Sequence, residues 1–357
     1  MSAPVKISDF HGGLHMPDHK AESNRRPIRA LPLPARLSVP LAQHIGEPAE
    51  PLVEVGASVL KGQVIGRAVD YVSANVHAPT SGTVVAVEPR PVPHPSGLRA
   101  PCVVIDSDGA ERWAELPPGL PDYAARDPAE LRERIRWAGI VGMGGAGFPT
   151  SVKTNPGARR TIDTLILNGA ECEPYITCDD RLMRERADRL VAGIDILRHL
   201  VGAQRSLVGI ENNKPEAAAA VRQAVAEAGL TGIEVVVVPT KYPSGGEKQL
   251  IHLLTGREVP SHGIPAEIGI VCHNVGTAVA VADAVLEGRP LIARVVTVTG
   301  SGIAEPQNFL VPIGTPAAAV IAGAGGYTAD ARRLVLGGPM MGFALHHDDI
   351  PVTKAAN

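Results

Sequence analysis

One glycine-rich run has the residue types and spacing to place backbone against a small molecule. Gly142, Gly144 and Gly147 match Gly-x-Gly-x-x-Gly within the run Gly142-Met143-Gly144-Gly145-Ala146-Gly147-Phe148. Glycine has no Cβ atom, so its backbone can approach a phosphate or a ring closely and aim amides at an anion. The dinucleotide fingerprint needs a strand directly before it, whereas residues 131–137 are typical of a helix. We therefore expect a cofactor contact here but no ordinary Rossmann start; a tight packing turn is the alternative.

Three further polar loops accompany segments that are typical of strands and helices. They are Asn168-Gly169-Ala170-Glu171-Cys172-Glu173-Pro174, Tyr242-Pro243-Ser244-Gly245-Gly246-Glu247 and Asn274-Val275-Gly276-Thr277. Ligands of open α/β sheets bind beyond the carboxyl ends of strands, and bare amides at a helix N-terminus suit a phosphate. Solvated loop carboxylates and a capping box of Ser244 and Glu247 are the plainer alternatives. Four such loops in one domain predict a cofactor cradle in which a bound flavin carries the chemistry.

The bulk composition narrows the class of protein. The 357 residues include 34 basic and 37 acidic side chains without a clustered basic surface, so no nucleic-acid partner is expected. No apolar run approaches the ~20 residues that cross a bilayer, and no signal peptide opens the chain, which predicts a cytoplasmic protein. The four cysteines (Cys102, Cys172, Cys178 and Cys272) form no Cys-x-x-Cys pair. We expect no metal site and no catalytic nucleophile–base pair in this chain.

The elements that would position these loops alternate between strand and helix. Strands are predicted at 164–167, 206–210, 234–238 and 294–299, and helices at 131–137, 179–200, 214–228 and 316–322. Aromatic residues make up only 3%, so the core must consist of Val, Ile, Leu and Ala, as suits a parallel sheet covered by helices. Strand–helix–strand units at this spacing predict parallel pairing, and the fold class is α/β.

The predicted domain organisation has six parts. An irregular arm (1–30) precedes a small β domain (31–115), a proline-rich linker (116–127), the α/β domain (128–290), a β-grasp-like domain (291–345) and a polar tail (346–357). Within the β domain, residues 53–66 and 76–85 resemble the two halves of a biotinyl/lipoyl-type barrel. Carrier domains of that type present a lysine between the halves, whereas residues 67–75 contain none. A structural or docking barrel is therefore expected.

The motifs resemble a known family. Residues 142–150, 168–175 and 274–277 resemble the flavin-binding loops of the NADH-oxidising subunit of respiratory complex I. The whole chain, including Gly12-Gly13, residues 40–46 and residues 337–342, is more specifically similar to the C subunits of Rnf (Rsx) ion-translocating electron transport complexes. The resemblance implies a flavin-dependent NADH dehydrogenase-type subunit with FMN in the α/β domain, NAD(H) stacked on it, and an SLBB domain of β-grasp type. It also implies a peripheral position on the cytoplasmic side of the inner membrane, with the other Rnf subunits as partners and electrons exchanged between ferredoxin and NAD.

The resemblance also assigns roles to individual residues. Gly144, Gly145 and Gly147 with Lys153 would line the flavin phosphate, and Asn168, Glu171 and Glu173 would face the flavin and the nicotinamide ribose. The complete set of implied cofactor-binding residues is Gly142, Gly144, Gly145, Ala146, Gly147, Phe148, Lys153, Asn168, Glu171, Glu173, Tyr242, Gly245, Gly246, Glu247, Asn274 and Thr277. Ala170 stands where the complex I pattern has an acid, which removes one polar contact.

A second departure from the family pattern concerns the iron–sulfur clusters and is larger than the difference at Ala170. Its members continue into two cysteine runs that hold [4Fe–4S] clusters, and no such run is present in this chain, which predicts a truncated chain or a shortened homologue. A non-catalytic scaffold that keeps the fold as a docking platform is the alternative function. A biotin or lipoyl carrier is disfavoured by the missing lysine.

Overall fold

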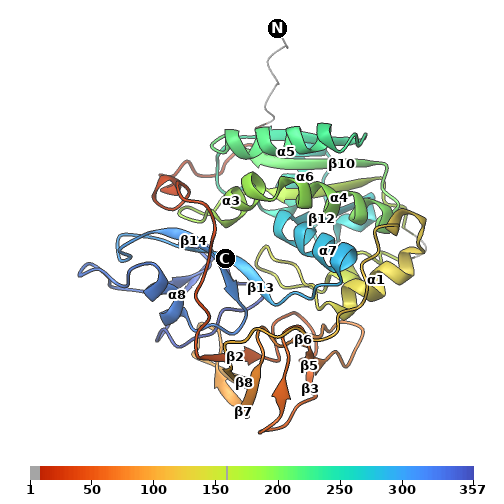
Figure 1. Ribbon diagram of the computed structural model, residues 1–357. Coiled ribbons are helices and arrows are strands. Elements are labelled where there is room, and N and C mark those ends of the chain that lie inside the picture. The colour runs from red at the N-terminus through yellow and green to blue at the C-terminus, as the bar shows by residue number, and fades with distance from the viewer. Residues whose placement is uncertain (1–8, 158–159) are drawn as a thin grey trace.

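The computed structural model describes residues 9–157 and 160–357, which form three units packed against one another (Figure 1). The α/β unit lies at the top of the view, the N-terminal barrel at the bottom and the C-terminal β unit beside them. None of the helices in the described ranges has both the length and the apolar character needed to cross a membrane. The predicted fold class, with its barrel, parallel sheet and C-terminal β unit, is confirmed.

The barrel is built from two small sheets. One has the order β2-β8-β7-β4, with β2 (Arg36–Pro40), β8 (Arg99–Ser107), β7 (Gly82–Pro91) and β4 (Ser58–Val59). The other has the order β3-β5-β6, with β3 (Glu50–Pro51), β5 (Val64–Arg67) and β6 (Val76–His77). The turn between β5 and β6 is docked, because Asn75 Nδ2 donates to the carbonyl of Trp137 at 3.2 Å and Lys354 Nζ donates to that of Asn75 at 2.6 Å. This tip therefore serves as a contact surface within the molecule.

The α/β unit holds a four-stranded parallel sheet of order β11-β10-β9-β12. Its elements are α1 (Pro128–Trp137), α2 (Thr150–Lys153), β9 (Thr164–Gly169), α3 (Cys178–Glu185), α4 (Ala187–Val201), β10 (Arg205–Glu211), α5 (Pro215–Glu227), β11 (Ile233–Val238), α6 (Glu247–Thr255), η3 (Pro265–Ile268), β12 (Ile270–Asn274) and α7 (Val275–Glu287). The strands are rich in Val, Ile and Leu, and Leu165, Ile166 and Leu167 of β9 are fully buried. The chain moves from β9 to β10 on one side, and β12 pairs with β9 on the other. This reversal creates a topological switch point between β9 and β12.

The predicted long helix over 179–200 is two helices. Arg186 leaves helical geometry with φ −132° and ψ 32°, so α3 ends at Glu185 and α4 begins at Ala187. The two helices have different partners, since α3 packs on α5 and on the C-terminal unit whereas α4 packs mainly on α7. The sequence predicted one helix because the apolar periodicity continues across Arg186, and each of the two helices buries one face.

The predicted linker is also packed against the α/β unit. Leu120 N donates to Val285 O on α7 at 2.7 Å, ahead of η2 (Tyr123–Ala125).

The C-terminal unit contains a sheet of order β1-β14-β13 and the helix α8 (Ala317–Gly323). Strands β13 (Ala293–Val298) and β14 (Gln307–Pro312) are antiparallel, and β1 (Arg29–Ala30), from the arm that also contains η1 (Lys20–Glu22), pairs parallel to β14. The short strands β15 (Val335–Leu336) and β16 (Phe343–Ala344) form a hairpin. The predicted polar tail does not trail away: Ile350, Val352, Thr353 and Lys354 are buried, and Val352 N donates to Thr315 O at 2.7 Å.

Candidate cofactor-binding site

The predicted loops meet at the carboxyl edge of the parallel sheet. Asn168 and Asn274 are register partners at the ends of β9 and β12, at the switch point. A Cβ atom added to Gly144 would lie 3.3 Å from the Cβ atom of Asn274, so the glycine loop passes directly over this point. Asn168 Nδ2 donates to Gly245 O at 2.8 Å and ties in the loop that follows β11. Four segments that are far apart in the sequence thus surround one edge of the sheet.

The glycine loop is closed at its base and open at its tip. Gly142 N donates to Phe148 O at 2.8 Å, and Ile45 N of the barrel donates to Gly147 O at 3.1 Å. The tip, residues 144–146, is exposed, and Gly145 has φ +105° with open space where a Cβ atom would lie. Among the described residues, no acceptor is hydrogen-bonded to the amides of residues 144–148. A loop with five free amides can surround an anionic group such as a phosphate.

The side chains of Asn274 and Thr277 form hydrogen bonds with other residues of this chain. Asn274 Oδ1 caps α7 by accepting from Gly276 N at 2.8 Å and Thr277 N at 3.4 Å, while its Nδ2 donates to Asp179 Oδ2 at 2.6 Å. Thr277 Oγ1 accepts from Met143 N at 2.9 Å. Asp179 is half-buried, and loss of solvation raises the pKa of its carboxyl although the Asn274 amide opposes that shift. These side chains hold the loops in place, and their polar atoms are already hydrogen-bonded.

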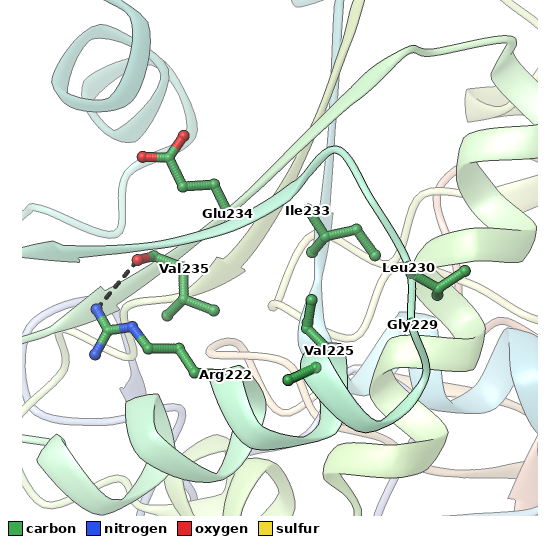
Figure 2. Close-up of a pocket in the computed structure, with 8 residues that line it drawn as sticks. Arg222, Val225, Gly229, Leu230, Ile233, Glu234 and Val235 are labelled. Carbon is green, nitrogen blue, oxygen red and sulfur yellow. Dashed lines mark hydrogen bonds between the residues drawn. The ribbon is translucent and has the colours of Figure 1, made fainter.

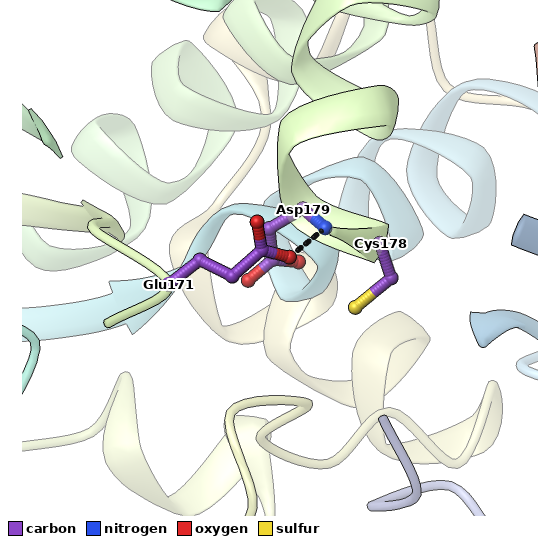
Figure 3. Close-up of side chains that lie close together, drawn as sticks. All are labelled: Glu171, Cys178 and Asp179. Atoms are coloured by element: carbon purple, nitrogen blue, oxygen red, sulfur yellow. Dashed lines mark hydrogen bonds between the residues drawn. The ribbon is translucent and has the colours of Figure 1, made fainter. Parts of the chain in front are cut away.

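Glu171, expected from the resemblance to face the flavin, caps α3 in the structure. Its carboxylate accepts from Asp179 N at 2.6 Å (Figure 3). It also accepts from Asp180 N at 3.3 Å, and Lys20 Nζ lies 4.0 Å from Oε2. Burial raises the pKa of Glu171 from 4.5 to about 8 against the opposing charge of Lys20. Ligand-type atoms of Glu171, Cys178 and Asp179 lie within 4.8 Å of one another. Two amides and one ammonium group already surround Glu171, so we assign this cluster to helix capping.

Glu173 contacts the C-terminal unit. Its two carboxylate oxygens accept from Met340 N at 3.0 Å and Met341 N at 2.8 Å. Gly338, at φ +86°, permits this approach, because a Cβ atom there would lie 2.5 Å from Glu173 Oε2. Lys20 Nζ shapes the same loop by donating to the carbonyls of Glu171 and Ile176 at 2.8 and 2.6 Å. In this structure Glu173 anchors the 337–342 turn beside the four converging loops, which we call the cradle.

The loop after β11 presents bare backbone as expected, but without a capping box. Ser244 Oγ donates to Glu211 Oε1 at 2.6 Å, and the N-cap of α6 is Gly246, which makes no side-chain cap. A Cβ atom on Gly245 would lie 3.0 Å from Cys172 Sγ, so glycine is needed for the close approach. Tyr242 is held by its backbone, which pairs with Leu14 of the arm. At the rim, Lys153 Nζ lies 2.6 Å from Glu247 Oε1.

A buried ion pair at the same edge was missed in the sequence. Lys214 Nζ lies 3.0 Å from Glu211 Oε2 and also donates to Ala170 O at 2.7 Å and Asn213 Oδ1 at 2.9 Å. Both side chains are almost completely shielded from solvent. Glu211 is the last residue of β10 and Lys214 lies three residues after it, so the rule on strand ends that predicted the other loops would also have predicted this pair.

A separate groove lies beside α5 and β11 (Figure 2). It is lined by Arg222, Val225, Ala226, Gly229, Leu230, Ile233, Glu234 and Val235. These residues surround the connection that enters the amino end of β11, which is the opposite end of the sheet from the cradle. None of the predicted site residues lines it.

Three families match successive parts of the chain. The RnfC barrel sandwich hybrid domain matches residues 8–110, the Nuo51 FMN-binding domain matches residues 135–283, and the SLBB domain matches residues 295–344. These ranges coincide with the three units of the fold. A crystal structure of NAD⁺-reducing [NiFe]-hydrogenase in the H2-reduced state is similar in fold, with a TM-score of 0.55, 23% identity, and coverage of 67% of this chain and 47% of that one.

Curated relatives match almost the whole chain. Proteins named as the C subunit of an ion-translocating oxidoreductase complex are 54% identical in Pseudomonas aeruginosa and 48% identical in Rhodobacter capsulatus, over 98% and 99% of this chain. The chain spans 44% of the length of the Pseudomonas protein and 68% of the Rhodobacter protein. With three matching domains in order and this identity, the chain belongs to the family of C subunits of ion-translocating oxidoreductase complexes.

Proposed function

We propose that this chain binds FMN at the carboxyl edge of its parallel sheet and that the flavin exchanges a hydride with NAD(H). The observation that carries the proposal is the convergence of the glycine loop on the Asn168–Asn274 switch point, with five loop amides that donate to no acceptor in the described part of the chain. The match to an FMN-binding domain over residues 135–283 supports it. Bound flavin would supply the redox chemistry, and the residues of this chain would bind and orient it.

The geometry suggests how the site residues divide their roles. The free amides of residues 144–148, with the glycine-lined start of α6 at Gly245 and Gly246, would hold FMN, and the backbone of Gly142 would close the loop. Lys153 and Glu247 would meet the ligand from the rim. Asn168, Asn274 and Thr277 would keep the loops in register, and Glu171, Glu173 and Tyr242 would support them from behind. This division keeps all the predicted positions in one site but reassigns Asn168, Glu171 and Glu173 from ligand contact to support of the loops.

We also propose a wider role, which the names of the relatives support. The relatives are named as subunits of ion-translocating oxidoreductase complexes. We place this chain in such a complex as its peripheral NADH-interacting subunit, on the cytoplasmic side of the membrane, exchanging electrons between ferredoxin and NAD together with the other subunits. The [4Fe–4S] clusters that would carry electrons onward have no ligand motif in these 357 residues.

FMN binding and reduction test the proposal directly. The purified chain, incubated with FMN and separated from free flavin, should remain yellow and should be bleached anaerobically by NADH. Substitution of Gly145 by leucine places a side chain in the open space of the cradle at φ +105° and should abolish FMN retention. Gly56→Leu is the matched control, because Gly56 in the barrel has φ +90° and equally open surroundings. Loss of FMN in both variants, or retention in both, would contradict the assigned site, and a wild-type chain that retains no flavin would contradict the function.

A further inference from the structure

Arg294 is a buried cation that no sequence motif indicated. It lies on β13, in the C-terminal unit, and only 3% of it is exposed. Among residues 9–157 and 160–357, no carboxylate oxygen forms an ion pair with its guanidinium within 4.0 Å, and the carboxylate of Asp179 attracts it only from a greater distance. A buried charge without a partner is costly unless several hydrogen bonds compensate for it. The acceptors that Arg294 does contact are therefore informative.

Most of those acceptors belong to two other segments. Arg294 Nη1 donates to Lys354 O at 2.7 Å, and Nη2 donates to Asn357 Oδ1 at 3.2 Å. Both terminal nitrogens also lie 3.4 Å from the carbonyl oxygen of Met143. The planar fork of the guanidinium can serve acceptors in different directions at once, which an ammonium group cannot do with the same geometry. Arg294 thus connects the C-terminal unit and residues 354–357 to Met143 in the glycine loop.

The contact with Met143 determines which way the next amide points. In a trans peptide the carbonyl and the following N–H point in opposite directions. Because the Met143 carbonyl faces the buried guanidinium, the amide of Gly144 points away from it. Met143 N is held at the same time by Thr277 Oγ1 at 2.9 Å. Both backbone polar groups of Met143 are therefore held, one from α7 and one from β13.

We infer that Arg294 is a positioning residue that orients the glycine loop for FMN and adds positive potential beneath it. This inference rests on the proposed function and adds to it a contribution from β13 of the C-terminal unit. A fixed cation behind the loop stabilises negative charge in front of it, and reduced FMN accumulates more negative charge than oxidised FMN. Arg294 should therefore strengthen FMN binding and make the flavin easier to reduce.

Two substitutions separate orientation from charge. Arg294→Met removes both the fork and the charge, so the FMN dissociation constant should rise about tenfold. The midpoint potential should become more negative by about 30 mV, which is the equivalent of a tenfold change in the affinity ratio of reduced and oxidised FMN. Arg294→Lys keeps the charge but not the fork, and should weaken FMN binding while leaving the potential close to wild type. Arg332→Met is the matched control, because Arg332 is exposed in the same unit and contacts only nearby carbonyls.

The measurements are FMN fluorescence titration of the apo-chain and anaerobic potentiometry of the loaded chain, with thermal unfolding of the apo-chain as a folding check. Should Arg294→Met fail to fold, Arg294→Lys still decides the issue, because wild-type affinity in that variant overturns the positioning role. Equal potentials for Arg294→Met and Arg294→Lys overturn the electrostatic role. A wild-type chain that binds no FMN overturns the proposed function together with this inference, whereas unchanged binding in both variants overturns the inference alone.

Discussion

The groove beside α5 and β11 and the cradle at the carboxyl edge of the sheet differ in how they are assembled. The groove beside α5 and β11 comes from one stretch, residues 222–235, and its internal polar contact is Arg222 Nη2 to Val235 O at 3.1 Å (Figure 2). The cradle at the other end of the sheet draws on the arm, four loops, the barrel and the C-terminal unit, and buried charges support it from behind. A groove of this local kind can form at any connection between a helix and the following strand. Buried charges from distant segments are costly and distinguish a candidate site better than the shape of the surface does.

The largest expected difference between the two ends concerns Lys214. Lys214→Met leaves Glu211 buried without its cation, and we expect the free energy of unfolding to fall by about 3–5 kcal/mol. Urea unfolding followed by circular dichroism measures the change. The double variant Glu211→Gln/Lys214→Met should recover most of the loss, because no uncompensated charge remains. A loss below about 1 kcal/mol in the single variant would mean that buried charge at this edge matters no more than surface charge.

An intermediate effect should appear in the pH dependence of stability. The folded pKa of Glu171 is raised from 4.5 to about 8 by burial, so the folded chain binds this proton more tightly than the unfolded chain. The stabilisation is complete below pH 4.5 and is lost as the pH rises through 8, at roughly 1.4 kcal/mol per pKa unit. Glu171→Gln cannot lose this proton.

We therefore expect the stability of Glu171→Gln relative to wild type to increase from pH 5 to pH 8.5, as measured by thermal unfolding in matched buffers. Glu247→Gln is the control, because Glu247 is an exposed carboxylate in the same cradle. Parallel pH profiles for wild type and Glu171→Gln would contradict this prediction, because Glu171 would then have the same pKa in the folded and the unfolded chain.

The smallest effect should come from the groove. Arg222→Ala removes one exposed contact to a strand carbonyl, and the free energy of unfolding should change by less than about 0.5 kcal/mol. FMN affinity should be unchanged, because the groove lies at the opposite end of the sheet. A tenfold change in FMN affinity, measured by the same fluorescence titration, would erase the proposed distinction between the two openings.

The strands and most helices could be predicted because their apolar residues are local signals. Four consecutive valines predict β11, and the buried run at 165–167 predicts β9. The break at Arg186 could not be predicted, since it depends on α3 and α4 having different packing partners. The convergence of the four loops could be predicted from the general rule that ligands bind beyond strand ends, combined with glycines that leave backbone bare.

The roles of individual polar side chains depended on contacts that sequence spacing does not encode. A carboxylate after a strand can face a ligand or a backbone amide, and the partners of Glu173 are 167 and 168 residues away. Arg294 stands within an apolar strand pattern, and Lys354 within a segment that is typical of a polar tail, so neither carried a local signal. Each became recognisable only when distant segments were brought together around it.

The pairing of β1 with β14 has a consequence for the order of events during synthesis. Arg29 Nη1 donates to Gln307 Oε1, which is 278 residues later in the chain, and the arm cannot complete the C-terminal sheet before that residue emerges from the ribosome. At roughly 5–20 residues per second, the delay is about 14–56 seconds. During this interval β1 must remain unpaired while the barrel and the parallel sheet form. Strand β1 is translated before the strands of the barrel and of the parallel sheet. It is nevertheless among the last strands to pair.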